Sequence, residues 1–142
     1  MAADVTPRRL TRCDMPLTEA DSAKAYATAC DAIQDRVRER VGPKCVVFFA
    51  AYGLDADQLP IANLDVVPIT GKVVIRGSRI HGIQRSADYE SPILESPSWL
   101  DLCVIANDQI ATTRDRIHRY LEHIEIVEIH DDTRIASFRF GG

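Results

Sequence analysis

The sequence predicts an α+β domain of two layers, in which a long N-terminal helix packs on a mostly antiparallel sheet and a second short helix precedes a C-terminal hairpin. Three observations predict this class. One apolar stripe recurs at helical spacing over 18–41, short apolar segments bounded by Gly and Pro follow it, and apolar and polar residues alternate near the C-terminal end. No internal repeat and no linker divides the chain.

The first helix is expected over 18–41. Thr18 is a favourable N-cap, and Asp21 stands where a capping box places an acid. Gly42 and Pro43 then end the helix. A lone amphipathic helix needs a second layer to cover its apolar face, which predicts a sheet. The stripe consists of Tyr26, Cys30, Ile33, Val37 and Val41.

A series of short segments rich in β-branched and aromatic residues predicts that sheet. Pro68 places one of them at an edge, an end or a bulge. Gly77 and Ser78 form a two-residue hairpin signal between the last two. The predicted strands are "CVVFFAAY" at 45–52, "NLDVVPI" at 63–69, "KVVIR" at 72–76 and "RIHGIQR" at 79–85.

The C-terminal part is expected to contain a strand, a helix and a hairpin. A long polar loop over 86–98 leads to the strand "WLDLCVIA" at 99–106. Thr112 and Asp115 form a capping-box pattern that predicts a short helix over 112–122. Hairpin links throughout predict mostly antiparallel pairing. The last hairpin consists of "IEIVEIH" at 124–130, a turn at Asp131 and Asp132, and "RIASFRF" at 134–140.

Length and charge limit the class of protein. A chain of 142 residues suits one domain, expected over 17–142 after a flexible N-terminal arm over 1–16. The formal net charge of −4 argues against a general nucleic-acid binder and against a protein that binds anionic membranes. We recognise no signal peptide and no membrane-spanning stretch, so we expect a cytoplasmic protein.

The sequence contains no motif of a known catalytic or metal site. The four cysteines form no C-x-x-C pair, and no His stands at zinc-finger spacing from two of them. Nucleophile-elbow, phosphate-loop and dinucleotide-binding patterns are missing as well. We therefore expect no cofactor and no metal, and we assign no catalytic residue.

Three histidines and several acids crowd the segment 116–132. His118 and His123 are five residues apart, which separates them by about 140° on a helix, so they would not bind one metal ion together. His130 precedes a turn of two aspartates. We interpret the segment as the junction between a helix and a hairpin, with a structural role.

The predicted hairpin over 72–85 gathers positive charge on one face. Arg76 would lie opposite Arg79, with His81 on the same side. Two opposed arginines repel each other, so water, an acid such as Glu90 or an anionic ligand must offset them. Two interpretations remain open: a solvated or internally paired face, or a binding site for a phosphate or carboxylate.

The long loop supplies a second candidate site. Tyr89, Ile93 and Trp99 are candidates for an interface or the mouth of a pocket, because aromatic residues beside prolines form good contact surface. The alternative is that Trp99 and Ile93 fold the loop back onto the core.

Two functions follow from these observations. The first is a non-enzymatic binding or assembly module, expected as a homodimer with the sheet face or the long loop as its interface. The second is a small-molecule binding protein or enzyme, in which Arg76, Arg79 and His81 hold an anionic ligand and Asp101 or Glu90 accepts protons. We favour the first, because the sequence contains no recognisable catalytic constellation.

Overall fold

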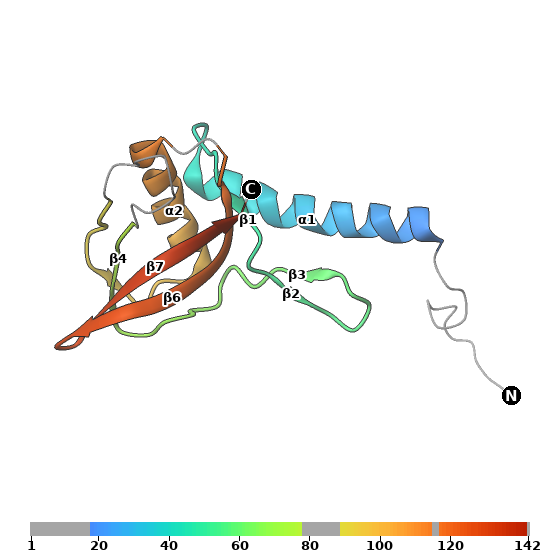
Figure 1. The fold of residues 1–142 in the computed structure, drawn as a ribbon. Helices are drawn as coiled ribbons and strands as arrows, with labels where there is room; N and C mark the ends of the chain where they lie inside the picture. The colour runs from blue at the N-terminus through green and yellow to red at the C-terminus, as the bar shows by residue number, and fades with distance from the viewer. Residues whose placement is uncertain (1–17, 78–88, 115–116, 142) are drawn as a thin grey trace, which may run out of the picture.

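A computed structural model describes residues 18–77, 89–114 and 117–141 of the chain (Figure 1). The predicted arm over 1–16 and the predicted strand over 79–85 lie outside the described residues. The elements are α1 (Glu19–Val41), β1 (Phe48–Phe49), β2 (Gly53–Leu54), β3 (Pro60–Ile61), β4 (Lys72–Ile75), β5 (Leu94–Glu95), α2 (Trp99–Thr113), β6 (Tyr120–His130) and β7 (Thr133–Gly141).

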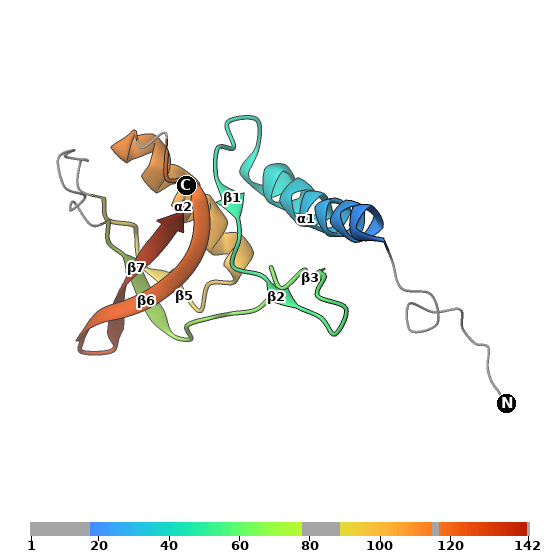
Figure 2. The ribbon, with the colours of Figure 1, turned by 45° about the vertical axis from the view of Figure 1, so that its right-hand side comes forward.

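The main sheet has five strands in the order β1-β6-β7-β4-β5, and its curvature is visible in Figure 2. The β6–β7 and β4–β5 pairs are antiparallel, whereas β1–β6 and β4–β7 are parallel, so the sheet is mixed. Parallel neighbours need a crossover, and the segment containing α2 provides it for both parallel pairs. β2 and β3 form a separate small sheet. The predicted α+β class, with a helix packed on a sheet, is confirmed.

α1 confirms the predicted first helix. Thr18 Oγ1 accepts a hydrogen bond from the backbone N–H of Asp21 at 3.0 Å. Gly42 ends the helix with φ of +102°, in the region that favours glycine. The N-terminal half of α1 is largely exposed and extends beyond the rest of the domain (Figure 1). The buried residues lie in the other half and are Ile33, Gln34 and Val37.

The second helix begins earlier than the sequence predicted. The predicted strand over 99–106 is wrong, because that segment forms the first half of α2. The predicted helix over 112–122 is wrong as well, because α2 ends at Thr113. Ser98 and Asp101 form a reciprocal capping box that starts α2, and this was the missed signal, since a short apolar run alone does not separate strand from helix. The buried apolar residues of α2 are Trp99, Leu102, Cys103, Ala106 and Ile110.

Two other predicted strands are shorter or missing. The segment 63–69 is not a strand but a loop that is held to the core by Leu64 and Ile69, which are 0% and 8% exposed. The segment 45–52 contributes only Phe48–Phe49 to the sheet. The predicted strands at 72–76, 124–130 and 134–140 are confirmed as β4, β6 and β7.

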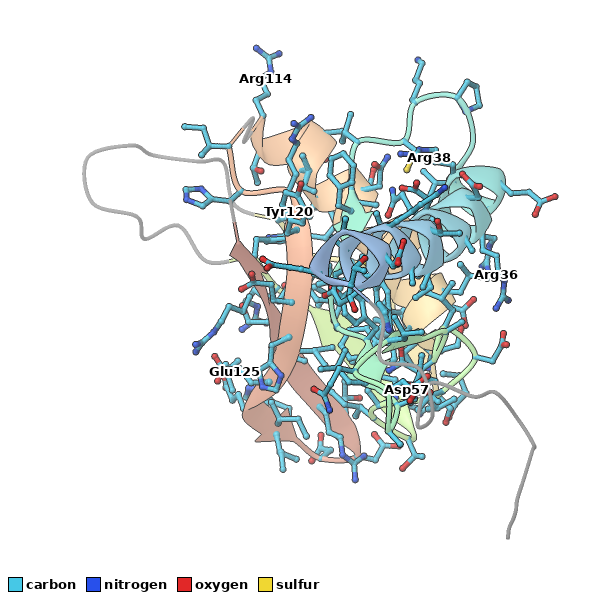
Figure 3. The ribbon with its side chains drawn as sticks, turned by 90° about the vertical axis from the view of Figure 1, so that its right-hand side faces the viewer. Arg36, Arg38, Asp57, Arg114, Tyr120 and Glu125 are labelled. Atoms are coloured by element: carbon cyan, nitrogen blue, oxygen red, sulfur yellow. The ribbon has the colours of Figure 1, made fainter. Side chains whose placement is uncertain are left out.

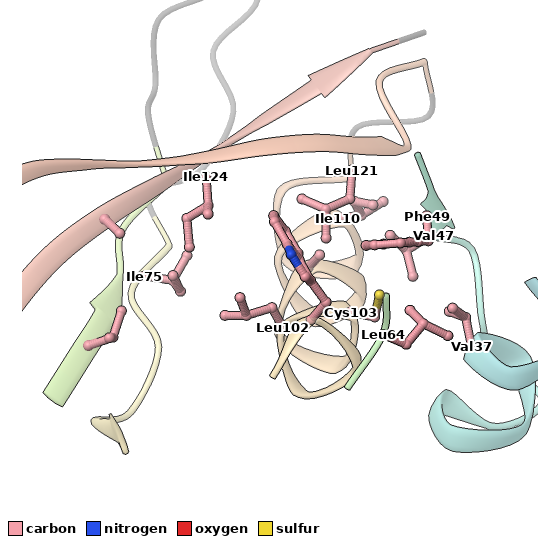
Figure 4. Close-up of a cluster of buried hydrophobic side chains, with 14 of the residues drawn as sticks. Val37, Val47, Phe49, Leu64, Ile75, Leu102, Cys103, Ile110, Leu121 and Ile124 are labelled. Carbon is pink, nitrogen blue, oxygen red and sulfur yellow. The ribbon is translucent and has the colours of Figure 1, made fainter. Parts of the chain in front are cut away.

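The hydrophobic core lies between α2, the C-terminal half of α1 and the inner face of the sheet (Figure 4). Leu121 and Ile124 point from β6 toward α2, which lies at the centre of the cluster (Figure 4). Each fully buried aliphatic side chain of this kind contributes roughly 1.5–3 kcal/mol to folding. The largest fully buried side chains are Leu64, Ile75, Leu102, Leu121, Val37, Val47, Val73 and Cys103.

Candidate functional site

Arg76, one of the predicted anion-binding residues, follows β4 directly and has acidic partners in its own chain. Its Nε lies 3.3 Å from Glu90 Oε1, and its Nη1 lies 3.8 Å from Glu128 Oε1. Arg76 and Glu90 also form a backbone bridge. Arg79 and His81 lie outside the described residues. Arg76 therefore has the internal carboxylate partners that one of the two interpretations expected.

The three predicted contact residues of the long loop do not share one surface. Trp99 is buried in the core and packs edge-to-face against Phe49, with ring centroids 5.6 Å apart. Tyr89 is buried too, and its hydroxyl donates a hydrogen bond to Asp108 Oδ2 at 2.8 Å. Burial and the Asp108 carboxylate raise the pKa of Tyr89. Only Ile93, which is 65% exposed, is available to a partner.

The histidines of the C-terminal segment do not assemble a site. His123 and His130 both lie on β6. His130 Nε2 contacts the carboxylate of Glu128 on the same strand. Among the residues that the structure describes, no group of three His, Cys, Asp or Glu side chains could hold a metal ion.

Asp101, a predicted proton acceptor, has structural partners. It accepts a hydrogen bond from the backbone N–H of Ser98 at 3.0 Å and another from Arg40 Nη2 at 2.7 Å. The Ser98 bond and the Arg40 guanidinium hold the pKa of Asp101 below its usual range. Burial raises the pKa of Cys103 to about 12, so this thiol is protonated and unreactive at neutral pH. These groups stabilise the fold and do not form a nucleophile and base.

The strands β6 and β7 form a long ribbon that extends away from the helices (Figure 1). A two-residue turn of Asp131 and Asp132 joins the strands, and Asp131 has φ of +55°. The register between the strands shifts at Glu122 and at Val127, each of which forms a bulge on β6. A bulge bends its strand and increases the local twist.

The apolar character of β6 continues beyond the part that the core covers. Leu121 and Ile124 are 0% and 7% exposed, whereas Ile126, Val127 and Ile129 are 45%, 57% and 64% exposed. We call these last three residues the ribbon patch. Clustered exposed apolar side chains of this kind mark interaction surfaces.

One backbone edge of β6 is open next to the ribbon patch. β1 pairs with this edge only at its start, and the last hydrogen bond joins Ala50 N–H to Leu121 O at 2.9 Å. Within the described ranges, no strand pairs with the edge from His123 to His130. An open edge with exposed apolar side chains is a place where another strand can add.

The face of the ribbon that turns away from the core carries paired charges. Arg139 Nη2 lies 3.8 Å from Glu125 Oε1, and Lys72 Nζ lies 3.1 Å from Asp132 Oδ2. The bond to Lys72 holds the pKa of Asp132 below its usual range. Figure 3 shows Tyr120 at the paired end of β6 and Glu125 further along the strand, on its open part. These ion pairs thus lie on the face of the ribbon opposite to the one that carries Ile126 and Ile129.

The ribbon patch was not singled out from the sequence. The strand over 124–130 was predicted, but not the part of it that lacks a cover. The physical reason is length: the 11 residues of β6 extend about 37 Å, whereas the 15 residues of α2 rise only about 22 Å. A strand this long extends past the end of the helix that covers it, so part of it stays exposed. The length of the strand was therefore the signal in the sequence that could have indicated the ribbon patch.

Comparisons with protein-family models, with curated protein sequences and with solved structures found no match. In the described part of the chain, no helix has both the length and the apolar character that crossing a bilayer requires.

Proposed function

We propose that this protein is a non-enzymatic assembly module that associates with itself, as a homodimer, through the ribbon patch. The observation that carries the proposal is the exposure of Ile126, Val127 and Ile129 beside an open backbone edge. A second chain stabilises both features, because it removes apolar surface from water and satisfies the free backbone groups.

The size of the patch sets the expected strength of association. Covering three half-exposed aliphatic side chains in each copy contributes on the order of 1 kcal/mol for each side chain. The loss of translational and rotational freedom opposes this gain. The net gain is therefore small, and we expect a weak dimer that dissociates on dilution.

The described residues support assembly over the anionic-ligand alternative. Arg76 lies between two glutamates of its own chain, which offset its charge. Asp101, proposed as a proton acceptor, caps α2 and binds Arg40.

The test is the molar mass in solution, measured by light scattering from about 1 to about 100 μM. We expect wild type to exceed the 15.8 kDa of one chain and to approach it on dilution. The double variant Val127→Lys/Ile129→Lys should remain at the mass of one chain, because lysines beside an open edge oppose strand addition.

Ile93→Lys is the matched control, because Ile93 is 65% exposed and lies next to β5, at the opposite edge of the sheet. This control should keep the wild-type mass. Wild type at the mass of one chain over the whole range would contradict the proposal. Equal dissociation of the control and the double variant would mean that the ribbon patch is not the specific interface.

A further inference from the structure

We infer that two copies of the chain pair antiparallel along their β6 edges, with a twofold axis between Ile126 and Val127. This inference rests on the proposed function and specifies its geometry. The five-stranded sheets of the two copies then form one continuous sheet, and the interface is the same surface on both.

The ends of the open edge determine where the axis lies. The edge begins at His123, after the contact of Leu121 with β1, and ends at His130, before the turn. Two copies overlap along this whole edge only when His123 of one lies opposite His130 of the other. That alignment places the axis between the two central residues of the edge.

The sequence of the open edge matches itself in this alignment. Residues 123–130 read "HIEIVEIH", and in reverse they read "HIEVIEIH", so the only difference is the exchange of the central Ile and Val. Apolar residues then meet apolar residues, and polar residues meet polar ones. A second copy is the partner whose strand has this match by symmetry. The opposed pairs are Ile124 with Ile129, Glu125 with Glu128 and Ile126 with Val127.

The bulge at Val127 places the opposed side chains of this alignment on the same face of the sheet. In a regular strand, Ile124 and Ile129 would point to opposite faces, because their positions differ by five, an odd number. Here Ile124 pairs with Phe138 and Ile129 pairs with Arg134 of β7, and those two partners are an even number of residues apart. Both isoleucines therefore lie on the same face of the sheet, as an opposed pair requires.

The backbone groups point in the right directions as well. The two-residue turn closes on the pair His130–Thr133, which makes this a hydrogen-bonded pair. Alternation along the ribbon then directs the N–H and C=O of Ile129, and beyond the bulge those of Ile126 and Ile124, to the open edge. Opposed Ile124 and Ile129 direct these groups toward each other, as an antiparallel hydrogen-bonded pair requires.

The charged face needs compensation in this arrangement, and the structure contains it. Glu125 of one copy lies opposite Glu128 of the other, and like charges in that position repel. Arg139 lies 3.8 Å from Glu125, and Arg76 lies 3.8 Å from Glu128. Each glutamate therefore approaches the second copy with a guanidinium beside it, which offsets the repulsion.

Disulfide cross-linking between positions 125 and 128 tests the alignment. These residues face each other in a non-hydrogen-bonded pair, where Cα atoms are about 4.5 Å apart, close enough for a disulfide. We expect Glu125→Cys/Glu128→Cys to form a covalent dimer under mild oxidation. Neither single variant should do so above wild type, because its cysteine lies two register positions from the equivalent one, about 7 Å along the strand in addition to the spacing across the interface, which is too far for a disulfide.

Adding Val127→Lys to the double-cysteine variant is the matched control and should abolish the covalent dimer. A dimer in light scattering without a cross-link specific to the double variant would overturn the β6 pairing and leave self-association standing. A single variant that cross-links as well as the double variant would overturn this alignment. Wild type at the mass of one chain at every concentration would overturn both proposals.

Discussion

The backbone edges of β1 and β6 differ in their hydrogen-bond partners. Side-chain amides of the two helices bind the outer edge of β1, whereas the edge of β6 from His123 to His130 has no strand partner among the described residues. Two amide side chains thus bind the backbone of β1 and of the residues just before it, in the place of a further strand. The open edge of β6 lies beyond the helices, where no amide side chain of the described residues binds it.

The amide of Gln34 occupies the place that a neighbouring strand would take. Its Nε2 donates to Val47 O at 2.8 Å, and its Oε1 accepts from Phe49 N–H at 3.1 Å. Asn107 Oδ1 accepts from the N–H groups of Val46 and Val47 at 2.7 and 3.1 Å. Changes at the covered edge should therefore alter folding stability, and changes at the open edge should alter association.

The largest expected effect is that of Gln34→Leu at the covered edge. Gln34 is only 8% exposed, so the change leaves the carbonyl of Val47 and the N–H of Phe49 without partners in the interior. We expect the free energy of unfolding to fall by about 3 kcal/mol in urea denaturation. Asp31→Asn, at an exposed position of the same helix, should change it by less than about 0.5 kcal/mol. A loss below about 1 kcal/mol for Gln34→Leu would show that β1 does not depend on this amide.

Asn107→Leu should have the next largest effect, about 1–2 kcal/mol, because Asn107 is half-buried and water can replace part of its bonding. Both amides bind the backbone of Val47, so the effects of Gln34→Leu and Asn107→Leu should not add. A double-mutant cycle in urea measures this coupling. Strict additivity would mean that the two amides act independently.

A smaller effect is expected at the ion pair between α1 and α2, the helices that carry the two amides. Asp101 has a lowered pKa, so its stabilisation is present above its unfolded pKa of about 3.9 and is lost as pH falls through the folded value. Wild type should exceed Asp101→Asn by less than about 1 kcal/mol at neutral pH, because the side chain is 42% exposed. The difference should shrink below about pH 4 in acid titrations of stability. A difference that is constant from pH 7 to pH 3 would exclude the carboxylate charge as its source.

The smallest expected effect on folding is that of Ile129→Lys at the open edge. Ile129 is 64% exposed, so the free energy of unfolding of a single chain should change by less than about 0.5 kcal/mol. The same change should weaken the dimer, which sedimentation velocity of the folded protein can measure. A large loss of folding stability in the single chain would show that the open edge, like the covered one, contributes to folding.

Local signals in the sequence predicted α1, β6 and β7, because a cap at Thr18 and the alternation of apolar and polar residues act over few residues. They did not predict α2, whose apolar run also fits a strand. These local signals do not predict contacts between parts of the chain that are distant in the sequence. Gln34 lies on an amphipathic helix, and nothing near it in the sequence shows that its amide binds β1. The exposure of the ribbon patch likewise depends on how far α2 covers the sheet.

The topology of the sheet has a consequence for the order of folding. β6 and β7 form the centre of the sheet, yet they come last in the chain, and β1 and β4 each join them by parallel pairing across long stretches of sequence. During synthesis, β1 has no neighbour in this order, and β4 has only the two-residue strand β5, until the C-terminal hairpin emerges from the ribosome. The hairpin pairs locally across a two-residue turn, so it can form first and act as the template for both earlier strands. A chain truncated before Tyr120 should retain the residues of both helices but lack β6 and β7, the strands on which the helices pack.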